Sequence, residues 1–224
     1  MTIGQAGLVT TDWIEWHDSY DDPNSAHSSR LSLIQGHIAD ALTALPAGPI
    51  KLVSACAGDA RDVLGVLAGH ARAAEVAGRL IELDPALAER ARTRVEALRL
   101  DRIEVVTGDA SITSSYIGAV PADLVLFCGV FGNVADGDIA KTISVLPSFC
   151  SPNATVIWTR HRREPDLTPK VRQWFAQAGF TEIAFDSPES SPGVVHGWIG
   201  VGVHRFGGPP MSVRTNERLF TFFR

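Results

Sequence analysis

The sequence predicts a doubly wound α/β fold, and two observations support this prediction. From residue 50 onward, short apolar runs alternate with segments in which apolar residues recur every three or four positions. Glycine and proline separate most of these segments, and the length of 224 residues fits one domain. We therefore expect a mostly parallel seven-stranded sheet with an antiparallel edge strand and an N-terminal helical cap.

The first predicted element is a helix that begins at Ser28 and ends at the Pro/Gly-rich residues 45–49. The strands are predicted at residues 50–57, 78–83, 102–107, 122–129, 154–159, 181–185 and 218–223. The helices between them are predicted at residues 62–70, 85–98, 136–146 and 169–178. Asp84 is expected to cap the second of these helices and Pro85 to open it. The last two strands are expected to pair as an antiparallel hairpin across a Gly/Pro-rich passage, residues 188–210.

Composition and charge indicate which kinds of molecule this protein is not expected to bind, among them nucleic acids, metals and membranes. Hydrophobic residues make up 45% of the chain and charged residues 20%, which is typical of a globular protein. A formal net charge of −5 argues against nucleic acid, because binding phosphates requires a clustered positive excess. The three cysteines show no metal-ligand spacing, so we expect reduced thiols and no metal site. No leader and no long apolar stretch is visible, and we expect a cytoplasmic protein that does not associate with membranes.

The residues that follow the predicted strands are the candidates for ligand binding, because open parallel sheets bind ligands at the carboxyl ends of their strands. Small residues follow the first strand in Ser54–Asp62, which lets a ligand approach the backbone closely. This loop lacks the G-x-G-x-x-G pattern that a dinucleotide pyrophosphate needs, so a nicotinamide cofactor is disfavoured. Glu82 ends the second strand, where an acid can accept hydrogen bonds from a ribose diol. Asp84 is better explained as the helix cap.

At these positions the chain resembles the class I S-adenosylmethionine-dependent methyltransferases over roughly residues 50–185. The run LVSACAGDARDVL is similar to their first motif, with Cys56, Gly58 and Ala60 on its three glycine positions, and Ser54 replaces the usual acid of this motif. LIELDPALAERAR resembles the second motif, VVTGDA the third, and ADLVLFCGVFGNV the fourth strand and the turn after it.

The resemblance implies a Rossmann-like core and S-adenosylmethionine (SAM) as cofactor. It places Glu82 on the ribose, Asp109 and Ala110 on the adenine, and Cys128 and Gly129 at the methionine end. The full set of expected cofactor-binding residues is Tyr20, Ala55, Cys56, Ala57, Gly58, Glu82, Leu83, Asp109, Ala110, Cys128 and Gly129. It also implies methyl transfer to an oxygen or nitrogen of a small-molecule acceptor by a monomer or homodimer. We expect one methyltransferase domain over residues 1–224, with residues 1–47 as a cap or lid and 48–224 as the core.

Two residues are candidates for catalysis. His161 follows the fifth predicted strand among three arginines, and we expect it to act as a general base. The alternative is a structural histidine in a solvated basic loop. Asn133 follows the fourth strand and is expected to orient the acceptor, although a turn residue with a left-handed backbone is an equal interpretation. Tyr20 belongs to an aromatic and acidic cluster that either closes over the cofactor or packs on the core.

Two other functions remain open from the sequence. A non-catalytic SAM-binding or regulatory protein would explain the altered first motif. An NAD(P)-dependent oxidoreductase would use a similar sheet but lacks its glycine pattern. A nucleic-acid substrate is disfavoured by charge and by the absence of an Asn/Asp-Pro-Pro-aromatic sequence after the fourth strand.

Overall fold

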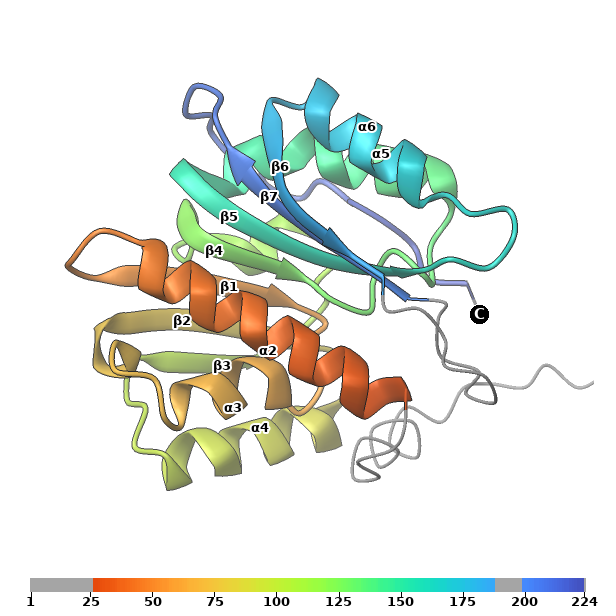
Figure 1. Ribbon diagram of the computed structural model, residues 1–224. Coiled ribbons are helices and arrows are strands. Elements are labelled where there is room, and N and C mark those ends of the chain that lie inside the picture. Colours follow the sequence, from red (N-terminus) through yellow and green to blue (C-terminus); the bar gives the residue numbers. More distant parts are fainter. Residues whose placement is uncertain (1–25, 188–198, 224) are drawn as a thin grey trace, which may run out of the picture.

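The computed structural model describes residues 26–187 and 199–223, and its centre is a seven-stranded sheet with the order β3-β2-β1-β4-β5-β7-β6 (Figure 1). The strands are β1 (Ile50–Ala55), β2 (Val76–Glu82), β3 (Ile103–Thr107), β4 (Ala122–Phe127), β5 (Cys150–His161), β6 (Phe180–Asp186) and β7 (Ile199–Phe206). Strands β1 to β5 are parallel, whereas β7 is antiparallel to both β5 and the edge strand β6. The predicted Rossmann-like, doubly wound, mostly parallel sheet is confirmed.

Helices cover both faces of this sheet (Figure 1). The helices are α2 (Ala26–Ala44), α3 (Arg61–Leu67), α4 (Pro85–Ala97), α5 (Asp136–Val145) and α6 (Thr168–Gln177), with 3-10 turns at η2 (Ala73–Glu75), η3 (Thr113–Tyr116) and η4 (Leu146–Phe149). Side chains of α2, α3 and α4 form one apolar core with the sheet, and those of α5 and α6 form the other. Each face of the sheet therefore has its own core, as a doubly wound fold requires.

Local sequence explains where two of the helices form. In α2, the side chains of Ile34, Ile38 and Leu42 recur at helical spacing and are at most 1% exposed, because this stripe packs on the sheet. Helix α4 begins as predicted, since the Asp84 carboxylate accepts hydrogen bonds from the backbone N–H groups of residues 86 and 87 at 2.8 and 3.1 Å. Pro85 occupies its first turn, where no backbone donor is needed.

The predicted last strand, residues 218–223, is wrong. The last strand is β7, which lies inside the passage that the sequence indicates as a connection, and residues 218–223 make only two isolated bridges to other loops. The glycines of this passage indicated a loop, but in β7 they leave the space that two aromatic rings occupy. A Cβ at Gly200 would lie 2.7 Å from the Phe185 ring, and one at Gly202 would lie 2.3 Å from the Trp158 ring.

We expect the Gly202→Ala substitution to lower the free energy of unfolding by about 2 kcal/mol, because the added methyl overlaps the fully buried Trp158 ring. For a chain of this length the melting temperature should fall by roughly 4–8 °C. Differential scanning calorimetry measures this change. Gly36→Ala is the matched control, since that exposed glycine in α2 has open space around it and its replacement should slightly raise stability. Equal melting temperatures for wild type and Gly202→Ala would contradict this packing.

Candidate functional site

The loop after β1 keeps the backbone conformation of a glycine-rich loop although two of its glycine positions carry side chains. Cys56, Gly58 and Ala60 all have left-handed backbones, with φ of 52°, 57° and 55°. Non-glycine residues pay for this conformation, so the surrounding structure must hold it in place. Backbone hydrogen bonds do so: the N–H of Ala57 donates to Ile81 O at 2.9 Å, and that of Ala60 donates to Ala57 O at 2.8 Å.

Glu82 connects this loop to the end of β2. Its side chain is 8% exposed, and its two carboxylate oxygens accept hydrogen bonds from the N–H groups of Gly58 at 2.7 Å and Asp84 at 2.8 Å. A carboxylate has about four lone-pair sites, so two protein donors leave capacity for a ligand. Glu82 is therefore a fixed, partly satisfied acceptor at the carboxyl end of the sheet.

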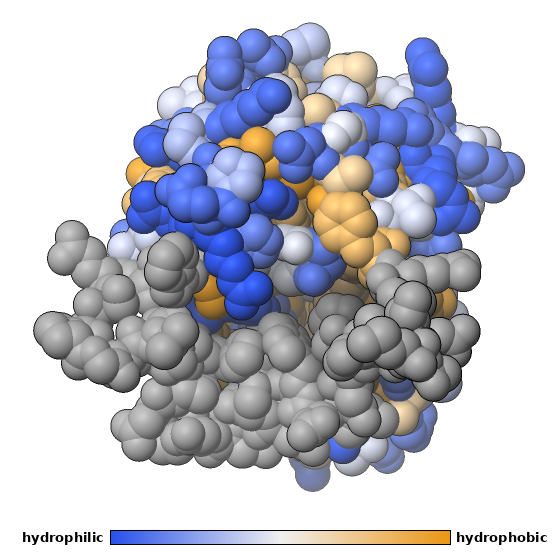
Figure 2. Space-filling view, turned by 90° about the vertical axis from the view of Figure 1, so that its right-hand side faces the viewer, coloured by the Kyte–Doolittle hydropathy of each residue, from blue (hydrophilic) through white to orange (hydrophobic). Residues whose placement is uncertain are grey.

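A cavity of about 550 Å³ lies at this end of the sheet. The loop after β1, the end of β2 with Leu83, and the turn after β4 supply one part of its lining. The first turns of α2 and the C-terminal residues Phe222 and Phe223 supply another. Figure 2 views this end of the molecule and shows apolar side chains exposed among polar and charged ones. The size is typical of a site for a small molecule or cofactor.

Two opposite charges line the same cavity, Arg30 from α2 and Asp62 from α3. Burial raises the pKa of Asp62 above its ordinary value of 3.8, while the positive charge of Arg30 acts in the opposite direction. The nearby Asp59 is 1% exposed and serves a structural role, because it pairs with Arg61 at 2.6 Å and with Arg94 of α4 at 3.1 Å. Arg30 and Asp62 are thus two groups of opposite charge on the cavity lining.

The turn after β4 forms the opposite part of the lining. Gly129 has a left-handed backbone with φ of 82°, and its N–H donates to the Thr159 hydroxyl at 2.8 Å. The side-chain Nδ2 of Asn133 donates to Gly129 O at 2.7 Å, which fixes the turn and the Asn133 side chain together. Cys128 and Asn133 both line the cavity.

The two cysteines of the site are thiols. Burial, followed by the charges of Glu82 and Asp109, raises the pKa of Cys56. Burial and the charge of Asp62 raise the pKa of Cys128, which Arg30 only partly offsets. Because the thiolate is the reactive form, neither cysteine is suited to act as a nucleophile at neutral pH.

The structure brings most of the expected cofactor-binding residues together. Six of them line the cavity: Cys56, Ala57, Glu82, Leu83, Cys128 and Gly129. Gly58 donates a hydrogen bond to Glu82, and the catalytic candidate Asn133 also lines the cavity. Ala55 is buried at the end of β1 and does not line it. Asp109 and Ala110 follow β3, the strand next to β2, and do not line the cavity. The Asp109 carboxylate oxygen Oδ2 lies 3.5 Å from Nη1 of Arg218. Tyr20 lies outside the described residues.

His161 is the last residue of β5, so it belongs to the strand, which is longer than predicted. Its ring lies against the turn after β4, since a Cβ at Gly132 would be 3.3 Å from its Cδ2. The ring is not part of the cavity lining, and its buried Nδ1 has no hydrogen-bond partner among the described residues. Burial, followed by the charges of Arg160 and Arg163, lowers the pKa of His161 below 6.5. The imidazole is therefore neutral at physiological pH, the state that a general base needs.

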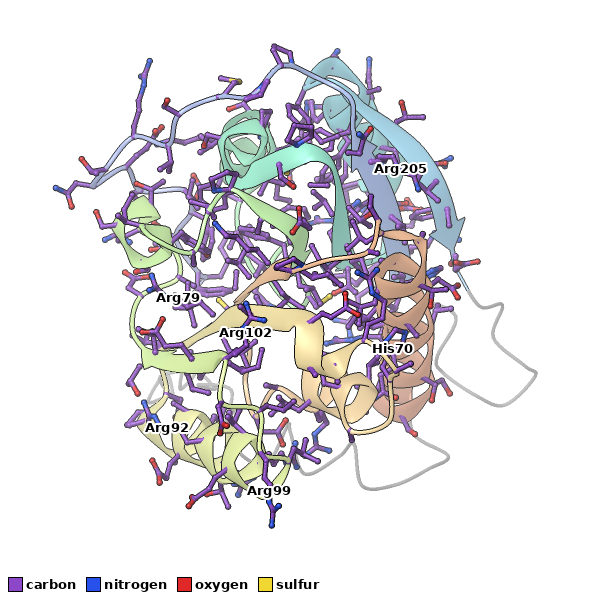
Figure 3. The ribbon with its side chains drawn as sticks, turned by 90° about the vertical axis from the view of Figure 1, so that its left-hand side faces the viewer. His70, Arg79, Arg92, Arg99, Arg102 and Arg205 are labelled. Atoms are coloured by element: carbon purple, nitrogen blue, oxygen red, sulfur yellow. The ribbon has the colours of Figure 1, made fainter. Side chains whose placement is uncertain are left out.

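This pKa can be measured directly. In an NMR titration of the ring, we expect His161 to titrate below 6.5, and Arg163→Gln to raise its pKa because a nearby positive charge is removed. Arg99→Gln is the matched control, since Arg99 lies at the opposite end of the molecule (Figure 3). An unchanged His161 pKa in Arg163→Gln would show that the two side chains do not interact.

Sequence reasoning did not assign five of the lining residues to the site, namely Leu31, Ile34, Asp62, Phe222 and Phe223. Leu31 and Ile34 belong to the helical stripe that predicts a core position, and the two phenylalanines were assigned to a strand. For Asp62 a signal was available, because it ends the small-residue loop that follows β1.

Two further properties concern only residues 26–187 and 199–223. Within these ranges, no helix has the length and apolar character needed to cross a membrane. The same part of the chain contains no group of three or more histidine, cysteine, aspartate or glutamate side chains arranged to hold a metal ion.

Comparison with known proteins shows the fold. No protein-family model matches the chain, and no curated protein matches it by sequence. Among solved structures, it is similar to an O-methyltransferase family protein from Burkholderia thailandensis, with a TM-score of 0.58, 15% identity, and coverage of 87% of this chain and 69% of that one. The chain shares the fold of this methyltransferase.

Two other solved structures show the same fold. Magnesium protoporphyrin IX methyltransferase from Synechocystis PCC 6803, crystallised with bound SAM, has a TM-score of 0.68 at 11% identity, over 91% of this chain and 100% of that chain. An rRNA methylase from Streptococcus thermophilus has a TM-score of 0.59 at 13% identity, over 77% and 95% of the two chains. The methyltransferase fold therefore occurs in proteins with different methyl acceptors, and the site must decide the function.

Proposed function

We propose that this protein transfers a methyl group from SAM to an oxygen or nitrogen of a small molecule. The observation that carries the proposal is the junction of the first loop with Glu82. Three alternate residues with left-handed backbones, Cys56, Gly58 and Ala60, form a loop that is hydrogen-bonded to the buried carboxylate at the end of β2, beside a cavity of about 550 Å³. The solved structures with this fold include one with bound SAM, which supports the choice of cofactor.

The residues present fit the three chemical parts of SAM. Glu82 would accept hydrogen bonds from the ribose hydroxyls, and the exposed Leu83 would pack against the adenine, with Asp109 and Ala110 on the neighbouring loop. Asp62 and Arg30 would meet the ammonium and carboxylate of the methionine part beside Cys128 and Gly129. This assignment gives Asp62 the charge that Ser54, which is 1% exposed in β1, does not supply.

The protein's task in this reaction is to position groups and exclude water. When bound, SAM supplies an electrophilic methyl group on a sulfonium. Asn133, fixed by its bond to Gly129, would orient the acceptor, and the neutral His161 would take a proton from an acceptor hydroxyl or ammonium. We propose both roles for residues that lie at the β4–β5 side of the site.

Three observations support a small-molecule acceptor. The cavity has the size of a small-molecule site, and the formal net charge is −5. The arginines labelled in Figure 3 come from separate elements. Arg79 and Arg92 among them pair with Glu104 at 2.7 Å and Glu89 at 3.0 Å. A monomer or homodimer in the cytoplasm remains our expectation.

Thermal-shift assays with SAM, S-adenosylhomocysteine and NADH test the cofactor. A ligand at 100 times its Kd adds about 2.7 kcal/mol to stability, which corresponds to a rise in melting temperature of roughly 5–11 °C. We expect this rise with the two sulfur compounds only. A rise with NADH alone would favour an oxidoreductase, and no rise with either sulfur compound would overturn the proposal.

Formation of S-adenosylhomocysteine then tests catalysis. We expect the protein to release it from SAM when a panel of small hydroxyl and amino compounds contains a suitable acceptor. Binding of SAM without product from any acceptor would favour a non-catalytic SAM-binding protein.

A further inference from the structure

The C-terminal segment, residues 216–223, is fixed across the end of the sheet that carries the cavity. Figure 1 shows the chain returning after β7 to the end of the molecule where the parallel strands finish. Backbone bonds attach it first to the loop after β3, with Thr113 N–H donating to Glu217 O at 2.9 Å and Leu219 N–H donating to Ser111 O at 2.7 Å. The N–H of Phe223 then donates to Asn133 O at 2.9 Å, in the turn after β4.

Side chains of this segment divide into anchors and cavity residues. Leu219 and Phe220 are at most 1% exposed and belong to the core on the α5 side of the sheet. Phe222 stacks edge-on with Phe220 at a centroid distance of 5.3 Å and lines the cavity. Phe223 also lines the cavity, but 67% of it is exposed. The anchors thus hold the backbone so that the Phe223 ring stands at the cavity rim in contact with water.

The sheet order places Phe223 on the acceptor side of the proposed site. Phe223 is bonded to the turn after β4, whereas Glu82 ends β2, and β1 lies between these strands. Strands two places apart in a sheet are separated by about 9.5 Å. Phe223 is therefore attached on the β4 side of the cavity, at Asn133, the residue we assign to acceptor orientation.

We propose that Phe223 forms a ring-binding wall of the acceptor subsite, and that the preferred acceptors carry a flat aromatic ring beside the hydroxyl or amino group. The proposal rests on the proposed function. An apolar ring kept exposed at a cavity rim by a fixed backbone gains most from a ligand that can stack on it. A saturated ring of the same size fills the same space but lacks this interaction.

Paired probes test this inference without knowledge of the natural acceptor. Phenol and cyclohexanol are titrated by ligand-observed NMR, with and without S-adenosylhomocysteine. We expect phenol to bind roughly 3- to 10-fold more tightly, the range that aromatic pairs contribute. This ratio should fall to about one in Phe223→Ala and recover in Phe223→Tyr, whereas the melting temperature and the affinity for S-adenosylhomocysteine should change little.

Met211→Ala is the matched control, because Met211 is also an exposed apolar residue, at 54%, but does not line this cavity. It should keep the wild-type ratio. Equal binding of the two probes to wild type, or an unchanged ratio in Phe223→Ala, would overturn the inference. Failure to bind S-adenosylhomocysteine would overturn the proposed function, while the probe ratio measured without it would still decide the role of Phe223.

Discussion

Glu82→Gln should reduce the affinity for S-adenosylhomocysteine by roughly 100-fold. Two hydrogen bonds from ribose hydroxyls to a carboxylate contribute about 3 kcal/mol together, and each 1.4 kcal/mol is a factor of ten. The amide has one acceptor oxygen, but the carboxylate accepts from the N–H groups of both Gly58 and Asp84. In the variant, an NH₂ group faces one of these donors, so the loop after β1 and the end of β2 are no longer held together. Isothermal titration calorimetry well below the melting temperature measures the loss.

Controls separate recognition from general damage. Glu89→Gln changes an exposed glutamate of α4 and should leave affinity unchanged. Glu82→Gln itself should lower the melting temperature by a few degrees, because a buried backbone donor loses its partner. An analogue of S-adenosylhomocysteine that lacks the ribose 2′-hydroxyl should lose less affinity in Glu82→Gln than the parent compound. Wild-type affinity in Glu82→Gln would contradict the assignment of Glu82 to the ribose.

Features fixed by local chemistry could be predicted from the sequence. The cap at Asp84 and the proline after it need only their own turn of helix, and they appear as predicted. The buried stripe of α2 follows from the spacing of Ile34, Ile38 and Leu42 alone. Glu82 was identifiable because its position at the end of an apolar run fixes its place at the sheet edge.

Features fixed by distant contacts could not be predicted. Gly200 and Gly202 resemble loop residues until Phe185 and Trp158 are seen to occupy the space of their missing side chains. Likewise, Arg30 and Phe223 reach one cavity from opposite ends of the sequence. No periodicity or spacing within a segment relates them, because only the sheet order and the return of the C-terminal segment bring them together.

Asp62→Asn should weaken binding of S-adenosylhomocysteine while it stabilises the ligand-free protein. Loss of a buried charge partner for the ligand's ammonium costs about 2 kcal/mol or more, which is roughly a 30-fold loss of affinity. In the ligand-free protein, burial raises the pKa of Asp62, so the ionised carboxylate opposes folding at neutral pH. Asparagine removes this charge and keeps an oxygen for the N–H of Val63, which donates to the side chain at 2.7 Å.

The difference in melting temperature between Asp62→Asn and wild type should depend on pH in a direction that general damage to the fold would not produce. A raised folded-state pKa means that protonation favours the folded protein, so wild type loses stability as pH rises from the ordinary value of 3.8 through the folded-state pKa. The advantage of Asp62→Asn in melting temperature should therefore be largest at neutral pH and disappear near pH 3.8, while Asp101→Asn, an exposed control, shows no such trend. A carboxyl group whose pKa is raised by burial gains from a ligand with a positive charge at that position, because such a charge favours the ionised form. A variant that loses both affinity and stability would instead place Asp62 in the scaffold of the loop.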